Sequence, residues 1–142
     1  MLKSLVADIP PRALQLMKKF WPGPLTLVFQ ARENLNPLIT AGSGKVGIRI
    51  PDNPFCLKLL KESKTSIVST SANISGKATN FSVESLKKLF ADRVDMFIDA
   101  GDLPQSLPST VLDVSEGMVK IVREGVISRK NLVRFLSNKM WE

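Results

Sequence analysis

The sequence predicts a mixed α/β protein with one sheet and one domain. Short segments with alternating apolar and polar residues are typical of strands, and they interchange with segments of helical apolar spacing. The 142 residues suit one domain with its own core, which we expect to span 1–142. Hydrophobic residues make up 44% and charged residues 23% of the chain, as in ordinary globular proteins.

The chain opens with a predicted helix and strand. Residues 8–20 are expected to be helical, because two prolines suit a helix start and apolar residues then recur at helical spacing. The sequence WPGP at 21–24 must end that helix. Residues 25–30 (LTLVFQ) follow as a strand, and 31–44 reads as a loop.

Residues 45–51 alternate strictly, which predicts a strand that a proline ends. Lys45, Gly47 and Arg49 share one face of this strand. Two cations beside a bare backbone patch suit a carboxylate or a phosphate, since arginine offers a planar fork of donors. The alternative is a half-exposed strand with solvated charges.

The middle of the chain repeats the helix–strand pattern. A helix is expected at 54–62, capped by Asn53, with three apolar side chains facing inward: Phe55, Leu59 and Leu60. Residues 65–70 then read as a short buried strand, 81–90 as a helix capped by Ser82, and 95–100 as a strand.

Two strands and a helix are predicted to close the chain. Strands at 109–115 and 118–124 are joined by a tight hairpin around Glu116-Gly117, and a helix covers 128–140. Ser109 opens the first of these strands and Arg123 lies near the end of the second. Taken alone, they are a strand-start hydroxyl and a surface cation.

The composition excludes several kinds of chemistry. Without histidine there is no Ser-His-Asp triad or histidine metal site, and the one cysteine, Cys56, cannot form a zinc cluster. With no disulfide framework, no membrane-length apolar run and no signal-peptide pattern, a cytoplasmic location away from membranes is expected.

The net charge of +7 is unevenly distributed. Residues 92–116 are acidic, whereas 118–141 carry six basic residues against Glu124 alone. A basic end suits an anionic partner such as a nucleotide or a nucleic acid. The alternative is a solvated basic helix face.

Hydroxyl and amide side chains gather at 69–80 (STSANISGKATN), directly after a predicted strand. Ligands in open α/β sheets favour the carboxyl ends of strands, so Ser69, Ser71 and Asn73 are candidates to contact one. The alternative is a turn that these residues cap through their own backbone.

Five blocks of the sequence stand in the order and spacing of one known family: WPGPLTLVF, VGIRIPD, STSANISG, PSTVLDV and IVREGVIS. Over nearly the whole chain, the sequence resembles the YrdC-like family of L-threonylcarbamoyladenylate synthases. The resemblance implies a twisted mixed sheet flanked by helices, with a concave basic cavity. It also implies a nucleotidyltransferase that joins L-threonine, bicarbonate and ATP, with Mg²⁺ on the phosphates, and releases pyrophosphate. Its product would serve threonylcarbamoyladenosine modification of tRNA.

The resemblance also assigns residues and partners. The threonine-binding positions are Arg49, Ser69 and Ser109. The ATP-binding positions are Lys45, where the family often has threonine, and four others: Ser71, Asn73, Thr79 and Arg123. No catalytic side chain and no metal ligand are expected, because the reaction needs orientation and electrostatic stabilisation. Double-stranded RNA, tRNA and other threonylcarbamoyl-transfer proteins are the implied partners.

One feature of the family is not found in this sequence. The family's P-T-[DE]-T-x-Y-G-L motif and K-x-R pair are absent, which implies a partial YrdC-like domain, truncated at its N-terminal side. Two alternatives to an active synthase stay open. The chain would be either a non-catalytic nucleotide- or double-stranded-RNA-binding remnant, or a subunit that needs an N-terminal partner.

Overall fold

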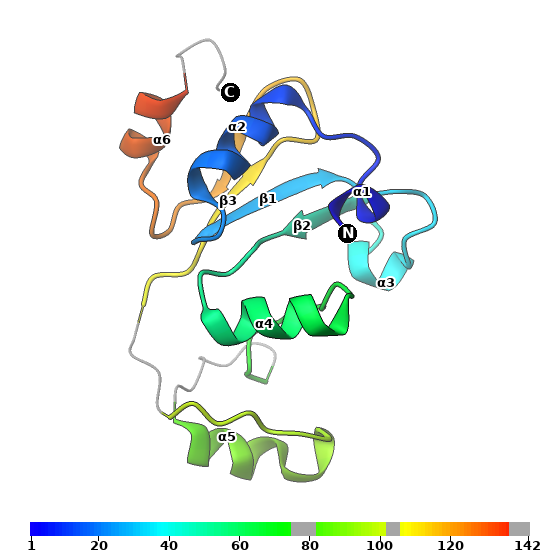
Figure 1. Ribbon diagram of the computed structural model, residues 1–142, viewed down its shortest axis with the longest axis vertical. Helices are drawn as coiled ribbons and strands as arrows, with labels where there is room; N and C mark the ends of the chain where they lie inside the picture. The colour runs from blue at the N-terminus through cyan, green and yellow to red at the C-terminus, as the bar shows by residue number, and fades with distance from the viewer. Residues whose placement is uncertain (75–81, 102–105, 137–142) are drawn as a thin grey trace. The chain divides into compact units, whose positions relative to one another are not determined.

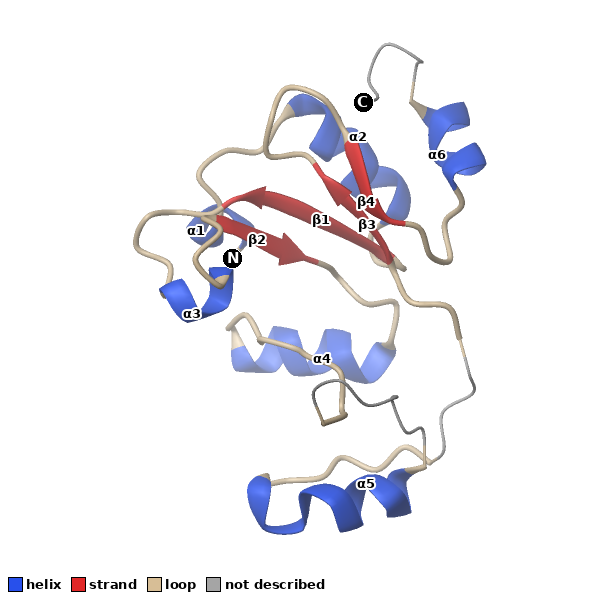
Figure 2. Ribbon diagram, turned by 180° about the vertical axis from the view of Figure 1, so that it is seen from behind, coloured by secondary structure: helices blue, strands red, loops and turns tan. Residues whose placement is uncertain are grey.

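The computed structural model describes residues 1–74, 82–101 and 106–136 of the chain. It contains two compact units, one formed by Met1–Ile67 with Leu107–Glu142 and the other by Val68–Ser106. Figures 1 and 2 show the sheet in the first unit and helix α5 in the second.

A four-stranded mixed sheet forms the centre of the first unit (Figure 2). Its strands are β1 (Leu25–Gln30), β2 (Lys45–Ile48), β3 (Thr110–Asp113) and β4 (Lys120–Arg123). They lie in the order β2-β1-β3-β4, with β1 parallel to β3 and antiparallel to β2, and β3 antiparallel to β4. The expected α/β class with a mixed sheet is confirmed.

The helices of the first unit are α1 (Leu2–Leu5), α2 (Pro11–Phe20), α3 (Pro37–Thr40), α4 (Pro54–Ser63) and α6 (Arg129–Phe135). Three residues of β1, namely Leu25, Leu27 and Phe29, are fully buried, and they share one core with Leu16 of α2 and Leu132 of α6. The intervening residues of β1 lie on the other face and stay partly exposed. One face of the sheet is therefore apolar and covered by helices, whereas the other is available for polar groups.

The second unit contains α5 (Val83–Phe90), followed by a 3₁₀ turn at Ala91–Arg93. Lys87 of α5 forms an ion pair with Asp99 at 2.8 Å. The predicted helix caps are confirmed in both units. Asn53 accepts a hydrogen bond from the Cys56 amide at the start of α4, and Ser82 accepts one from the Ser85 amide at the start of α5.

Two predicted strands are wrong. Residues 65–70 and 95–100 have no strand structure, and their apolar side chains are exposed, as shown by Val68 at 73% and Met96 at 75%. A strand needs a hydrogen-bonded neighbour and a surface to cover its apolar side. Neither segment is hydrogen-bonded to a neighbouring strand in the described part of the chain. Local β propensity alone therefore does not make them strands.

Five local expectations also need correction. Phe55 and Leu59 of α4 are exposed rather than inward-facing, and neither side chain belongs to the apolar core. Within the expected loop 31–44, Asn36 caps the short helix α3. Strand β2 ends at Ile48, and the turn between β3 and β4 is wider than the tight hairpin expected there. The final helix ends at Phe135, and 137–142 lie outside the described residues.

Among the described residues, no helix combines the length and the apolar character needed to cross a membrane.

Candidate functional site

The strand register places polar residues on the uncovered face of the sheet. Residues paired directly across neighbouring strands point to the same side. Gly47 pairs with Val28, Val28 with Asp113, and Val111 with Arg123. The polar face defined by these pairs also holds Gln30 and Lys45, which pair with each other, and Thr26. The predicted common face of Lys45 and Gly47 is confirmed.

The polar face has two ends with different chemistry. Arg49, Thr26, Ser109 and Arg123 belong to the end where β1 and β3 begin and where β2 and β4 finish. Lys45 lies at the opposite end, four residues before Arg49, or about 13 Å along an extended strand. We call these the arginine end and the lysine end of the polar face.

Arg49 is held at the arginine end through its side chain. Its Nε donates to the Gly23 carbonyl at 2.9 Å, and the Gly23 amide donates to the Ile50 carbonyl at 2.8 Å. The Nη1 and Nη2 atoms of Arg49 have no hydrogen-bond partner among the described residues. The guanidinium is thus oriented by the loop that follows α2, while its two terminal nitrogens can bind a carboxylate or a phosphate.

Ser109 connects two other groups at the arginine end. Its Oγ lies 3.0 Å from Thr26 Oγ1, and it accepts a hydrogen bond from Arg123 Nη2 at 3.3 Å. Arg123 Nη2 also donates to the Ser109 carbonyl at 2.9 Å. The sequence marked Ser109 and Arg123 as separate candidates, and the structure brings them into direct contact.

A buried hydroxyl supports this contact. Thr110 is fully buried, and its Oγ1 donates to the Ile127 carbonyl while it accepts hydrogen bonds from the Gly125 and Ile127 amides. These bonds fix the segment after β4 against the start of β3. The position of Arg123 beside Ser109 therefore depends on a buried network as well as on its own side chain.

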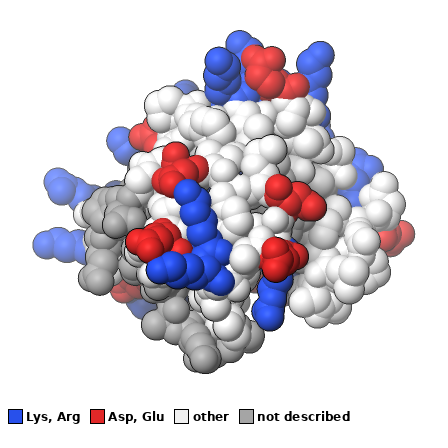
Figure 3. Space-filling view, turned by 90° about the horizontal axis from the view of Figure 1, so that it is seen from below, with Lys and Arg blue, Asp and Glu red and all other residues white. Residues whose placement is uncertain are grey.

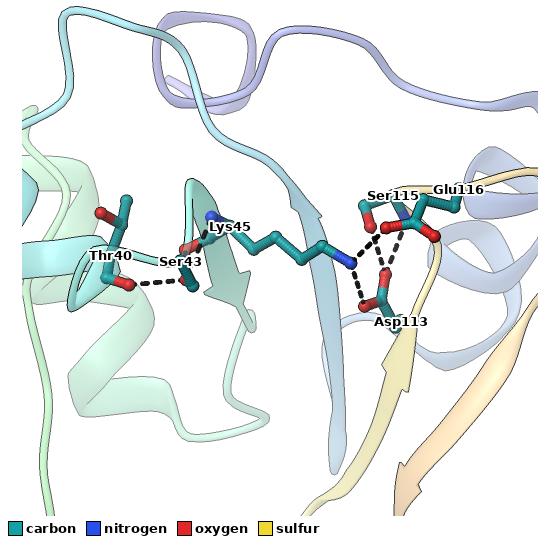
Figure 4. A network of polar contacts seen from close by, with 6 residues as sticks. All are labelled: Thr40, Ser43, Lys45, Asp113, Ser115 and Glu116. Atoms are coloured by element: carbon teal, nitrogen blue, oxygen red, sulfur yellow. Dashed lines mark hydrogen bonds and ion pairs between the residues drawn. The ribbon is translucent and has the colours of Figure 1, made fainter.

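Lys45 is engaged by two carboxylates at the lysine end. Its Nζ lies 3.0 Å from Asp113 Oδ2 and 2.7 Å from Glu116 Oε1 (Figure 4). Hydrogen bonds to Glu116 and Asp113 raise the pKa of Lys45. A phosphate that binds Lys45 must share the ammonium group with Asp113 and Glu116, or displace the more exposed of the two, Glu116.

The surroundings of Asp113 stabilise the ionised form of its carboxylate. Burial favours its neutral form, but hydrogen bonds from the Ser115 amide and hydroxyl and from Lys45 outweigh that effect, and the pKa of Asp113 is lowered. Figure 4 shows Ser115, Asp113 and Glu116 gathered around the lysine Nζ. No local sequence pattern predicts that Asp113 and Glu116 contact Lys45.

The remaining predicted site residues belong to the second unit. Ser69 and Ser71 are exposed, and the Asn73 amide donates to the Ser71 carbonyl at 3.0 Å, so the segment forms a local polar turn. Asn73 Nδ2 donates to the Ile74 carbonyl at 3.0 Å. Thr79 lies outside the described residues. Their roles in binding stay predictions.

The chain is similar to known proteins over most of its length. The family model for Sua5, YciO and YrdC, described as "Telomere recombination", matches residues 1–125. Threonylcarbamoyl-AMP synthase of Bacillus subtilis (strain 168) is 36% identical over 132 residues, which cover 92% of this chain and 38% of that protein.

Solved structures of related proteins share the fold. The structure of P. abyssi Sua5 complexed with L-threonine superposes with a TM-score of 0.88 at 33% identity, and the match covers 99% of this chain and 42% of that one. E. coli YciO matches with a TM-score of 0.79 at 30% identity, over 95% of this chain and 64% of that one. The chain thus spans less than half the length of the synthase from B. subtilis and of P. abyssi Sua5.

The mixed sheet, with one face under helices and the other lined by cations and hydroxyls, defines an α/β protein. The chain belongs to the Sua5/YciO/YrdC family. The resemblance predicted from the five sequence blocks is confirmed.

Sequence reasoning missed Thr26 and Gly23 as parts of the arginine end. Both lie in the WPGPLT block, which read as a helix terminator followed by a strand. The signal that was available is the period of two in β1, which puts Thr26 on the face opposite the buried leucines.

Proposed function

We propose that this chain is the substrate-binding part of a threonylcarbamoyl-AMP synthase. The reaction joins L-threonine, bicarbonate and ATP into L-threonylcarbamoyladenylate and releases pyrophosphate. Its product serves threonylcarbamoyladenosine modification of tRNA, in the cytoplasm. Membership of the family and the homologous synthases support this proposal.

The observation that carries the proposal is the arrangement at the arginine end of the polar face. Arg49 presents two nitrogens without a partner among the described residues, at the same sheet end as the hydroxyl of Ser109. A bidentate guanidinium at the same sheet end as a hydroxyl is suited to an amino-acid carboxylate. The related P. abyssi Sua5, whose fold matches over 99% of this chain, has been solved as a complex with L-threonine.

The bond changes need no protein nucleophile. The threonine amine attacks the carbon of bicarbonate, and water leaves to give the carbamate. A carbamate oxygen then attacks the α-phosphorus of ATP, the bond from that phosphorus to the bridging oxygen breaks, and pyrophosphate departs. The chain's contribution is to orient the reactants and to stabilise developing negative charge.

We assign the predicted residues to two substrates. Arg49, Ser69 and Ser109 would contact threonine. Five residues would contact ATP: Lys45, Ser71, Asn73, Thr79 and Arg123. Arg123 suits this role because its charge lies at the exposed end of β4, next to Ser109.

No residue of this chain is assigned to Mg²⁺. The described residues include no group of three side chains of the types that ligate metals, and the Asp113 and Glu116 carboxylates both bind Lys45. No step of the proposed reaction is routed through the ion.

Pyrophosphate release tests the proposal. Purified chain should release pyrophosphate from ATP only when L-threonine and bicarbonate are both present, and Arg49→Ala should reduce that release. The same reaction is repeated with the segment of the B. subtilis synthase that precedes the matched region added in trans. Release only in this second reaction would support the alternative of a subunit that needs an N-terminal partner. No release in either reaction, from folded protein, would refute the synthase proposal.

A nucleic-acid-binding role is the second candidate. The net charge of +7 favours it, although carboxylates lie beside some of the lysine and arginine side chains on the face drawn in Figure 3. Electrophoretic mobility shifts with tRNA and with double-stranded RNA at several salt concentrations test this role. Binding that weakens steeply with salt and occurs without turnover would favour the non-catalytic alternative.

A further inference from the structure

Thr26 occupies a central position at the arginine end of the polar face. It lies on β1, between β2, which leads into Arg49, and β3, which follows Ser109. Its hydroxyl lies 3.0 Å from Ser109 Oγ. Its methyl group points toward the backbone of Gly47, where an added Cβ would lie 3.4 Å from Thr26 Cγ2. The hydroxyl of Thr26 therefore faces Ser109, and its methyl group faces Gly47.

Counting donors and acceptors shows what the Thr26–Ser109 pair can offer. Each hydroxyl has one proton and two lone pairs. Arg123 can only donate, so it occupies one lone pair of Ser109 Oγ. The hydrogen bond between the two hydroxyls uses one of their two protons, whichever atom donates it. One O–H proton remains without an acceptor among the described residues, so it can be donated to an oxygen of a ligand.

We propose that Thr26 is a positioning residue of the threonine pocket, which holds the Ser109 hydroxyl so that the pair presents one O–H donor to an oxygen of the amino-acid substrate. This inference rests on the proposed function. Without the Thr26 hydroxyl, the Ser109 side chain keeps its contact with Arg123 but loses the neighbour that selects its rotamer.

Two substitutions distinguish the effect of the Thr26 hydroxyl from the effect of the side-chain volume. Thr26→Val keeps the volume and removes the hydroxyl, and Thr26→Ser keeps the hydroxyl and removes the methyl. Thr40→Val is the matched control, because Thr40 also uses its hydroxyl for one hydrogen bond, to the Pro37 carbonyl, and it belongs to α3 rather than to the arginine end. The unfolding midpoint of each variant is measured first, to confirm that it is folded.

The first measurement needs no ligand. Three-bond NMR couplings report the χ1 rotamer of Ser109. The parent, Thr26→Ser and Thr40→Val should show one staggered rotamer, whereas Thr26→Val should show an average over several. A single Ser109 rotamer in Thr26→Val would overturn the inference.

The second measurement is calorimetric titration with L-threonine and, separately, with ATP. Thr26→Val should weaken threonine binding about 5–10-fold, as expected for one hydrogen bond, with ATP affinity changed less than about twofold. Thr26→Ser should bind threonine within about twofold of the parent. Parent-like threonine affinity in Thr26→Val, or equal weakening in Thr26→Ser, would overturn the inference. If the parent itself binds no threonine, the proposed function fails for this chain, and the rotamer measurement still decides whether Thr26 positions Ser109.

Discussion

The Arg123 side chain turns back onto Ser109, 14 residues earlier, and its Nη2 donates to the Ser109 carbonyl at 2.9 Å. This contact requires the chain after β4 to approach the start of β3 closely. At Gly125, a Cβ atom would lie 2.1 Å from the Pro108 carbonyl oxygen and 2.8 Å from the Ser109 carbonyl carbon. Both obstacles are backbone atoms, so only glycine permits this approach without a backbone shift.

Gly125→Ala should therefore destabilise the fold and disturb the Arg123–Ser109 contact. We expect a loss of about 1–3 kcal/mol in the free energy of unfolding, as for overpacked positions. Urea unfolding measures it. Gly117→Ala is the matched control, because a Cβ there has no atom within 4 Å. Equal stability of the two variants would show that the close approach does not constrain this position.

Arg49→Ala should weaken threonine binding by about 2–3 kcal/mol, because the side chain supplies a charge-assisted pair of donors. Arg49→Lys should recover little of this loss, since an ammonium group cannot replace the fork or the Nε contact with Gly23. Calorimetric titration with L-threonine measures both effects. Arg93→Ala, in the second unit, controls for loss of charge, and an unchanged affinity in Arg49→Ala would remove Arg49 from the threonine site.

The sequence predicted which residues share a face but not which of them meet. The alternation in 45–51 was enough to place Lys45 and Gly47 together, because a strand has a fixed period of two. The contact of Lys45 with Asp113 joins residues 68 positions apart. It depends on the parallel register of β1 and β3, which no local pattern encodes.

The wrong strands have a related cause. Residues 95–100 carry the apolar residues of a strand, yet Met96 and Ile98 are exposed in the structure. Propensity describes how well a segment fits a pleated, half-buried surface, and it does not supply the neighbouring strand. By contrast, the helix caps Asn53 and Ser82 were predicted correctly, because a cap is completed within four residues of chain.

Acid should remove the stability that Asp113 contributes. Its pKa in the folded protein is below the usual value of 3.8, so this contribution is fully present above that value and is lost as the pH falls through the lower, folded pKa. Asp113→Asn should cost about 1–2 kcal/mol at neutral pH through loss of its charged hydrogen bonds. The difference between parent and variant should then shrink from about pH 5 to pH 2.

Urea unfolding at several pH values between these limits checks this prediction. Asp99 has a lowered pKa as well, because of its contact with Lys87, so the unfolding curve of the parent alone would mix two groups. The comparison with Asp113→Asn isolates one of them. Asp8→Asn, at an exposed carboxylate, is the control. A parent–variant difference that stays constant down to pH 2 would contradict the assigned role of Asp113.

Gly47→Ala should separate folding from binding. An alanine methyl at this position would meet Thr26 Cγ2 at 3.4 Å and Val28 Cγ2 at 3.9 Å, which are ordinary contacts. Alanine also loses less backbone entropy than glycine in a strand, so stability should stay equal or rise by about 0.5 kcal/mol. The same methyl stands on the polar face between Lys45, assigned to ATP, and Arg49, assigned to threonine, where the two proposed ligands would meet. Overfilling that space should weaken ligand binding by about 1–3 kcal/mol, roughly 5–150-fold. Overfilled space on the polar face thus separates the effect on binding from the effect on stability.

Calorimetric titrations with ATP and L-threonine measure the predicted loss of affinity, and urea unfolding measures the predicted stability, with Gly117→Ala as the control for both. Parent-like affinity with parent-like stability would show that neither ligand lies over Gly47, and the polar face would then lose its place in the proposed reaction.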